Sequence, residues 1–514
     1  MIEERKIIIG LIVSTQYIQQ IKDYWTVQLF ESKTAKRIAV WAMEYFEKYQ
    51  KAPGKEFESI YYRKKENGKG LPKDLIEEME EVILPGLSEE FENEEVNVDY
   101  LVDITKQYFN ERHIRKNAEE TLSLLDLGKP LEAEKNLRSF TAMAKDVNTW
   151  IDLNCENIHE KLHKAFTRSK EILIRFPGAL GEFLNNQLVR GAFVALMAPE
   201  KRGKSFWLLE FAMRAVKNKK RVAFFQAGDM DEDDQLVRVS CYLTGKAEME
   251  SSAGIMFQPV KDCIHNQTDT CDFKERVCQS GLFDAKMATK LRQNITLKEL
   301  MLARSENKEY IPCTKCSKFD KNKWGTVYVE KIDTGDPLTE DEAVEAFEEF
   351  FSKHKREFRL STHSNGTLSV QEMDNILSIW EQDGFIPDVI IVDYADLLID
   401  NSQKEERHRQ NKVWKDLRGL NQKRKCLLIT ATQTDASSYS NDLLTLDNYS
   451  EDKRKYGHVT AMYGLNQDHT WREKELGIMR LNEITMRKGN FSTLNQVHVL
   501  QNLSIGRPVI GSYW

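Results

Sequence analysis

The stretch "LMAPEKRGKSFWLLEF", Leu196–Phe211, contains the polar octet that decides the fold. The octet lies between the apolar run "AFVALM" and the helical pattern "SFWLLEFAMRAV". A strand, a glycine-containing turn and a helix in this order aim backbone N–H groups and a helix N-terminus at one point, which suits phosphate oxygens. We therefore predict a phosphate-binding loop. Its residues are Ala198, Pro199, Glu200, Lys201, Arg202, Gly203, Lys204 and Ser205.

Three positions of this loop have residues whose chemistry suits a bound phosphate. Gly203 permits the tight backbone path, Lys204 is placed to reach the β and γ phosphates, and the Ser205 hydroxyl can coordinate Mg²⁺. Ala198 stands where a glycine is usual, but its side chain is small. The predicted cofactors are therefore ATP and Mg²⁺.

Three further apolar runs end in polar residues that suit a nucleotide site. "DVIIVDYADLLI" carries Asp393, which can support the magnesium ion; "RVAFFQAGDM" carries Asp229, which can activate the attacking water. "CLLITATQTD" carries Gln433, which can sense the γ-phosphate. Any one of them is also explained as an ordinary strand-end cap. Together at one sheet edge they favour a nucleotide-driven machine.

The order of these runs predicts the domain organisation. From about residue 171, short β-branched runs alternate with helical patterns, which is typical of a parallel sheet with crossover helices. We expect an all-α N-terminal domain over 1–99, a helical hairpin and linker over 100–170, and an α/β ATPase domain over 171–514. The span 247–358 is too long for a plain loop and predicts an inserted subdomain.

Composition restricts the class of protein. The chain has 514 residues, 41% hydrophobic and 30% charged, with a net charge of −7. No run approaches the roughly 20 apolar residues that span a bilayer, so we expect no membrane partner and a cytoplasmic location. "IIIGLIV", Ile7–Val13, fits the first helix of the N-terminal domain better than a signal peptide. The acidic total argues weakly against a nucleic-acid coat protein, but permits a local basic channel.

Five cysteines fall within the predicted insertion and indicate a metal site. Cys313 and Cys316 have the C-x-x-C spacing that lets two thiolates face one tetrahedral ion. We predict a structural Zn²⁺ held by Cys263, Cys271, Cys313 and Cys316, with Cys278 as a substitute ligand. The alternative is a set of unligated thiols in a reducing cytosol.

The order of motifs resembles the DnaB-type replicative helicases, which have RecA-like motors. "RKIIIGLIVSTQYIQQI" resembles their helical N-terminal domain, and "FPGALGEFLNNQLVRGAFVALMAPEKRGKS" resembles the approach to their phosphate loop. "GDM", "VIIVDYADLL" and "ATQTD" resemble their acidic tip, aspartate strand and glutamine strand. The resemblance covers most of the chain and implies a RecA-like P-loop NTPase fold.

The resemblance also implies an assembly and a residue acting in trans. The family forms hexamers in which a neighbouring subunit supplies an arginine finger, and "ITMRKGNF" makes Arg487 the candidate here. Thr485 stands where the family has a lysine, so that role is either missing or filled by Lys488, and the alternative for Arg487 is a plain solvated charge. Asp229 stands where the family has a glutamate, and the insertion is an addition. The implied partners are single-stranded DNA, a primase and a helicase loader, with 5′ to 3′ movement. The divergence is typical of a bacteriophage version.

The DNA contacts are predicted in the segment after Gln433. Lys453, Arg454 and Lys455 could meet successive phosphates of a single strand; the alternative is an exposed charge run. Two other functions stay open from the residues. One is a RecA-like recombinase that coats DNA, and the other is a zinc-bearing scaffold or loader with a vestigial nucleotide site.

Overall fold

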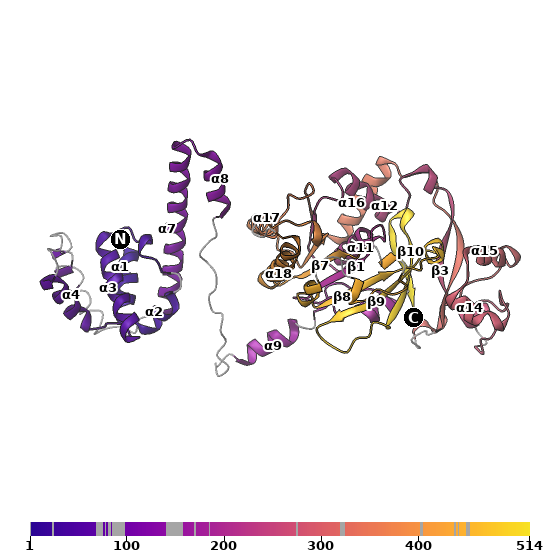
Figure 1. Ribbon diagram of the computed structural model, residues 1–514, viewed down its shortest axis with the longest axis horizontal. Coiled ribbons are helices and arrows are strands. Elements are labelled where there is room, and N and C mark those ends of the chain that lie inside the picture. The colour runs from indigo at the N-terminus through magenta and orange to yellow at the C-terminus, as the bar shows by residue number, and fades with distance from the viewer. Residues whose placement is uncertain are drawn as a thin grey trace. The chain divides into compact units, whose positions relative to one another are not determined.

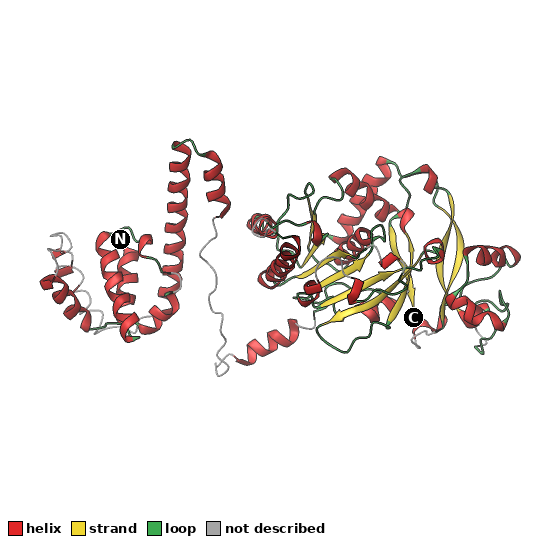
Figure 2. Cartoon of the chain, in the orientation of Figure 1, coloured by secondary structure: helices red, strands yellow, loops and turns green. Residues whose placement is uncertain are grey.

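A computed structural model gives the architecture of the chain, which divides into two compact units, residues 1–155 and 156–514. Figure 2 shows that the first is helical and that the second contains the strands. No helix among the described residues combines the length and the apolar character needed to cross a bilayer. The structure describes residues 2–22, 25–67, 76–77, 79–80, 84, 98–139, 158–168, 171–184, 186–273, 276–318, 324–400, 405–435, 438–439, 441–448 and 453–514.

The first unit is built from helices around one apolar core. Ile7, Ile38 and Phe109 are fully or almost fully buried in it, so the "IIIGLIV" run lies in the first helix of the unit. The helix α3 begins after Ser32, whose hydroxyl accepts the N–H of Ala35 at 3.2 Å. The described helices are α1 (Ile2–Val13), α2 (Thr15–Ile21), α3 (Lys33–Tyr49), α4 (Glu56–Asn67), α7 (Val98–Asp126) and α8 (Pro130–Ser139).

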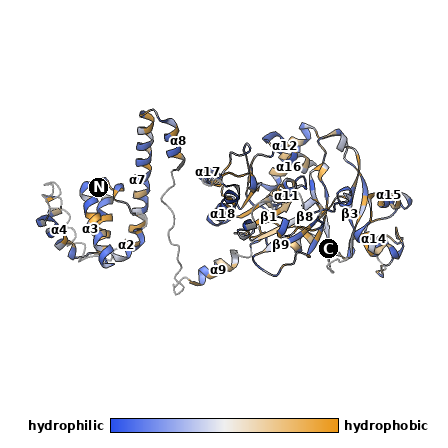
Figure 3. Cartoon of the chain, viewed as in Figure 1, coloured by the Kyte–Doolittle hydropathy of each residue, from blue (hydrophilic) through white to orange (hydrophobic). Residues whose placement is uncertain are grey.

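The helices α7 and α8 pack together as a hairpin (Figure 1). Gly128 turns the chain between them with φ +70°, a conformation that glycine adopts without strain. The Asn136 amide donates to Thr121 Oγ1 at 3.0 Å across the pair. Figure 3 shows both hydrophobic and hydrophilic residues along α7, and Leu122 and Leu125 on it are largely exposed.

The second unit is organised by a nine-stranded sheet. From β8 through β5 the six neighbouring strands pair in parallel, and β9, β10 and β11 extend the sheet in antiparallel fashion. The strand order is β11-β10-β9-β8-β1-β7-β6-β2-β5. The bounds are β1 (Phe193–Ala198), β2 (Val222–Gln226), β5 (Phe358–Thr362), β6 (Val389–Asp393), β7 (Leu427–Gln433), β8 (Ala461–Asn466), β9 (Ile478–Met486), β10 (Gln496–Asn502) and β11 (Arg507–Tyr513).

Both faces of the parallel strands are covered, which is why β1 is apolar at every position. Val194 and Leu196 lie in one core cluster with Phe211 of α11. Phe193 and Met197, which point to the other face, lie in a second cluster. Outside the span between β3 and β4, the described α-helices of the second unit are α9 (Ile158–Arg168), α10 (Gly178–Leu184), α11 (Lys204–Lys217), α12 (Glu232–Thr244), α16 (Glu340–His354), α17 (Val370–Gln382), α18 (Glu406–Arg424) and α19 (Arg472–Glu475).

An antiparallel pair of strands lies outside the main sheet, within the span predicted as an insertion. It consists of β3 (Ile255–Cys263) and β4 (Gly325–Asp333) and carries α13 (Ile264–Gln267), α14 (Ala288–Gln293) and α15 (Leu297–Glu306) between them. We call residues 255–333 the inserted hairpin. The helix α16 that follows packs against α12, and β5 pairs with β2, so both belong to the main α/β body.

These observations confirm the predicted fold class: a mostly parallel sheet with helices on both faces, together with a helical N-terminal part.

Candidate functional site

The predicted phosphate loop joins the end of β1 to the start of α11. Gly203 precedes the helix with φ +81°, and Lys201 also has a positive φ of 55°. A side chain at Gly203 would be strained by this φ, and its Cβ would approach Leu503 Cδ1 at 3.2 Å. The turn therefore places the N-terminus of α11 at the carboxyl edge of the sheet, and a helix N-terminus favours anions.

Lys204 is held against its own loop. It is 8% exposed, and its Nζ donates to the carbonyl oxygens of Ala198 (3.2 Å) and Pro199 (3.0 Å). Burial lowers the pKa of Lys204, and the nearby carboxylates Asp396, Asp229, Asp393 and Glu200 oppose that shift. A lysine side chain among these carboxylates is of the kind that reaches the phosphates in a phosphate-binding loop.

Ser205 and Asp393 meet at the base of the loop. The Ser205 hydroxyl donates to Asp393 Oδ1 at 3.1 Å, and the Asp393 side chain is fully buried. Burial raises the pKa of Asp393 to about 6, while the Ser205 hydrogen bond and the nearby Arg238 charge oppose the rise. A hydroxyl beside a buried carboxylate is an oxygen donor pair of the kind that Mg²⁺ prefers, so these residues fit a magnesium ion.

Asp229 stands at the end of β2, on the same edge. Gly228 before it has φ +119°, and a Cβ there would lie 2.3 Å from Asn365 Cα. Only glycine allows the loop after β5 to pass this close. The Asp229 side chain is exposed, and its charge acts on both Lys204 and Asp393. The geometry brings Asp229 to the phosphate loop, as its place at a strand end predicts.

Gln433 connects the loop with the aspartate strand. Its Nε2 donates to Glu200 Oε1 at 2.9 Å, and its Oε1 accepts from the Tyr394 hydroxyl at 3.3 Å. Its backbone N–H donates to Asp396 Oδ2 at 2.9 Å. Side-chain hydrogen bonds therefore join the phosphate loop to the end of β7.

Asp396 also fixes the segment that follows β7. Its Oδ1 accepts from Lys455 Nζ at 2.9 Å, and the Lys455 side chain is 1% exposed. The prediction that Lys455 contacts DNA is therefore wrong, because a charge run was taken as exposed and the partner lies 59 residues away in the sequence. Arg454 is exposed, and the side chain of Lys453 lies outside the described residues.

Arg487 follows β9 at the opposite edge of the sheet. Met486 pairs with Ala461, which pairs with Val194 near the start of β1, whereas the loop follows the end of β1 at Ala198. Four residues of strand separate the two levels by about 13 Å. The exposed Arg487 donates from Nη2 to Gly457 O at 2.6 Å. Arg487 therefore lies at the level of the start of β1, at the end of the sheet opposite its own chain's phosphate loop.

The cysteines of the inserted hairpin do not form the predicted metal site. Among the described residues, no group of three or more His, Cys, Asp or Glu side chains is placed to hold a metal ion. The zinc prediction therefore has no structural support. The buried Asp262 organises this region instead: it accepts from the N–H groups of Cys263 (2.7 Å) and Cys313 (2.8 Å) and from the Tyr310 hydroxyl (2.7 Å). The Cys278 thiol donates to Ser280 O at 3.4 Å.

The remaining predicted ligands lie in the same inserted hairpin: Cys271 precedes α14, and Cys316 is exposed in a short helical turn. The clustering of five cysteines and one C-x-x-C spacing made this prediction, and neither shows whether two distant cysteine pairs converge.

Three residues of the site were not identified from the sequence. Tyr394 and Asp396 follow Asp393, and their alternation in "VDYAD" was the available signal. Gln226 pairs in register with Asp393 across β2 and β6. With its amide turned to suit its neighbours, it donates to Asp393 Oδ2 at 3.2 Å. It ends an apolar strand, as Asp393 and Gln433 do, but Asp229 was taken as the polar end of that run.

A solved structure of a DnaB-like replicative helicase, described together with its interactions with primase, aligns with nearly the whole chain. The match covers 98% of each chain, with a TM-score of 0.51 and 13% sequence identity. The chain has the fold of a DnaB-like replicative helicase. The family resemblance of the motifs is thereby confirmed at the level of the fold, including the helical N-terminal part.

Two further solved structures match the ATPase portion at TM-scores too low to carry an argument. One is an ATPase domain, with 12% identity and a TM-score of 0.44, covering 70% of this chain and 99% of that one. The other is a KaiC-like protein from the hyperthermophilic archaeon Pyrococcus horikoshii, with 10% identity and a TM-score of 0.34, covering 67% and 98%. No family model and no curated protein matches the sequence.

Proposed function

We propose that the chain is an ATP-driven replicative DNA helicase that moves along single-stranded DNA and separates duplex DNA. The observation that carries this is the assembled edge of the sheet: Lys204, Ser205 and Asp393 converge on the phosphate loop, and Gln433 connects that loop to the segment after β7. The 13%-identical fold match supports the class of motor.

Each residue has a role that follows from its position. Bound nucleotide supplies the phosphoanhydride, and bound Mg²⁺ neutralises phosphate charge. With nucleotide bound, Lys204 would exchange its two carbonyl partners for phosphate oxygens, and Ser205 and Asp393 would hold the magnesium ion. Asp229, exposed at the end of β2, orients and deprotonates the attacking water.

The position of Arg487 supports an assembly. It lies at the sheet edge opposite its own phosphate loop, so it meets a γ-phosphate only when a second copy places its loop against this edge. We propose a homo-hexamer in which Arg487 stabilises transition-state charge in the neighbouring site.

The DNA and protein partners are proposed from the fold and from the chain's charges. The exposed Arg454 follows the glutamine strand, where it can meet DNA phosphates in the centre of a ring. The first structural neighbour is described with its interactions with primase, and we propose a primase and a helicase loader as partners of this chain. A cytoplasmic location, in a host cell if the protein is viral, fits this role.

The test is ATP hydrolysis with and without single-stranded DNA. We expect DNA to stimulate ATP hydrolysis by the wild type, and we expect Lys204→Ala to hydrolyse no ATP with or without DNA. Lys298→Ala, which removes an exposed lysine on α15, serves as the matched control and should hydrolyse ATP like the wild type. Hydrolysis that ignores DNA and is equal in the wild type and Lys204→Ala would overturn the proposal.

A further inference from the structure

A groove of about 610 Å³ lies where the inserted hairpin meets the main sheet and the segment between β8 and β9. None of the eight residues of the phosphate loop lines it. Its side chains are mostly polar or charged, which suits a polar ligand better than the apolar anchor of a protein partner. The hairpin contributes Arg292 and Asn294, the β8–β9 segment contributes His469 and Arg472, and the sheet contributes Arg480 and Gln496.

The acidic residues that line the groove already have basic partners. The N···O distances of the three pairs are 3.1 Å for Asp468–Arg472, 2.8 Å for Glu473–Arg480 and 3.6 Å for Asp442–His469. These pairs leave the groove without an isolated negative charge.

Arg292 is the cation that remains available. It is exposed, and no carboxylate among the described residues forms an ion pair with it. Its Nη2 donates to one backbone carbonyl oxygen at 3.2 Å. A guanidinium has five N–H donors, so Arg292 keeps donors for an anionic group in the groove.

An exposed tryptophan lies beside Arg292. Trp324 directly precedes β4 and is 52% exposed. The Arg292 guanidinium lies 5.8 Å from the centre of the Trp324 ring, and the His265 ring meets the same ring at a centroid distance of 4.9 Å. An exposed ring with a guanidinium beside it can stack a base and contact the neighbouring phosphate.

A second exposed tryptophan adjoins the other side of the groove. Trp471 directly precedes Arg472 and is 60% exposed, and the Lys474 ammonium lies 4.2 Å from the centre of its ring. The φ of Trp471 is +64°, which is strained for a residue with a side chain. Strained residues concentrate at functional sites, so this backbone conformation indicates a use for the outward ring.

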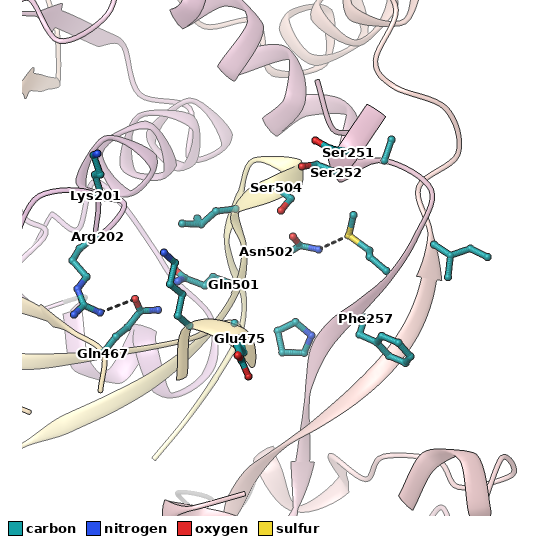
Figure 4. A pocket seen from close by; sticks show the side chains of 17 residues that line it. Lys201, Arg202, Ser251, Ser252, Phe257, Gln467, Glu475, Gln501, Asn502 and Ser504 are labelled. Atoms are coloured by element: carbon teal, nitrogen blue, oxygen red, sulfur yellow. Dashed lines mark hydrogen bonds between the residues drawn. The ribbon is translucent and has the colours of Figure 1, made fainter. Parts of the chain in front are cut away.

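The inserted hairpin is fixed against the main sheet where it carries Trp324. A Cβ on the adjacent Gly325 would lie 2.4 Å from Tyr513 Cβ, so only glycine lets β4 begin this close to β11. Figure 4 shows Asn502 of β10 at a second junction, where its Nδ2 donates to Met256 Sδ of β3 at 3.1 Å. The groove therefore has walls that are held in place by the sheet.

The groove is distant from Arg454, the exposed residue proposed above to meet DNA. Lys455, the next residue, is anchored to Asp396, which follows β6. The groove is lined from β9 and β10, and four steps between neighbouring strands separate β6 from β9. At about 4.8 Å for each step, the two places lie roughly 19 Å apart across the sheet.

The charge of the inserted hairpin also differs from that of the rest of the chain. Residues 255–333 contain 14 Lys and Arg against 11 Asp and Glu, whereas the other residues contain 60 against 70. A positively charged extension on an acidic chain favours a polyanion as its partner.

We propose that this groove binds single-stranded DNA as a second contact, with a base stacked on Trp324 and a phosphate against Arg292. The inference rests on the proposed helicase and extends it. At a fork, one unpaired arm occupies the ring, and the inserted hairpin offers a surface to the other arm.

The experiment compares a forked duplex that carries two oligothymidine arms with the same duplex that carries either arm alone. Equilibrium binding is measured by fluorescence anisotropy with a non-hydrolysable ATP analogue. We expect the wild type to bind the two-armed fork about five- to hundredfold more tightly, because one stacked base contributes a factor of this size. Trp324→Ala and Arg292→Ala should lose most of this preference, and Trp324→Phe, which keeps a stacking surface, should retain it.

Matched variants and a crosslink locate the contact. Phe273→Ala and Lys298→Ala remove another exposed aromatic and another exposed cation of the inserted hairpin, neither of which lines the groove, and both should bind like the wild type. With 5-iodouracil in the second arm, irradiation should give an adduct that mass spectrometry assigns to Trp324.

The outcomes separate this inference from the proposed function. If single-stranded DNA stimulates hydrolysis but the wild type binds one-armed and two-armed substrates equally, the helicase stands and the second contact is overturned. A preference for two arms that survives Trp324→Ala, with no adduct on the inserted hairpin, also overturns it and leaves a protein as the occupant of this surface. If no DNA binds to the wild type, the proposed function and this inference both fail.

Discussion

Removing the charge of Asp396 should destabilise the second unit strongly. The carboxylate of Asp396 accepts hydrogen bonds from Lys455, Thr432, Trp414 and the backbone of Gln433. Asp396→Asn leaves the ammonium of Lys455, 1% exposed, without its counter-charge. Breaking a buried pair from one side lowers the free energy of unfolding by about 3–5 kcal/mol.

The assay is a double-mutant cycle followed by calorimetry of the second unit. Lys455→Met removes the charge while keeping much of the side-chain volume. We expect the double variant to lose about 1–3 kcal/mol less free energy of unfolding than the two single variants lose together, because the two charges are coupled. The exposed pair Arg221–Glu357 of the same unit is the control, with an expected coupling of about 1 kcal/mol or less. Strict additivity at Asp396 and Lys455 would refute the reasoning.

Three other predictions follow from the site and the sheet. Arg487→Ala should keep ATP binding and lower kcat by about 10³-fold or more, and mixing it with Lys204→Ala subunits should restore part of the activity, which rate measurements on mixed assemblies check. Gln433→Ala should keep basal hydrolysis and lose about tenfold of its stimulation by DNA, since the link to Glu200 is removed; unchanged stimulation would contradict this role. Burial lowers the pKa of His498 from 6.5 to about 4, so the unfolded chain takes up a proton there first and stability falls as the pH falls from 6.5 to 4. In thermal unfolding at several pH values, His498→Gln should lose about 1–3 kcal/mol less unfolding free energy than the wild type over this pH range. The same pH dependence in both proteins would rule out this role of His498.

The main α/β body could be predicted because its signals are local. The octet at Ala198–Ser205 has a strand before it and a helix after it, and β6 and β7 are apolar runs ending in polar residues. Parallel strands buried on both faces leave this pattern in any sequence. The edge strand β5 is half-buried throughout and was not predicted, because it has no continuous apolar run; it begins where the span assigned to the insertion ends.

The contacts that sequence reasoning missed join distant segments. Lys455 is a basic residue in a basic run, and only the fold shows that Asp396 neutralises it. The cysteine spacing was equally local, and the fold places Asp262 rather than a metal at the centre of that region.

The central claim is that ATP hydrolysis drives strand separation, and a strand-displacement assay on a forked DNA duplex tests it most directly. We predict that the wild type releases the displaced strand with ATP and Mg²⁺, but not with a non-hydrolysable analogue, and that Lys204→Ala releases none. A wild type that hydrolyses ATP in the presence of single-stranded DNA but leaves the fork intact would contradict the helicase and favour a DNA-coating recombinase.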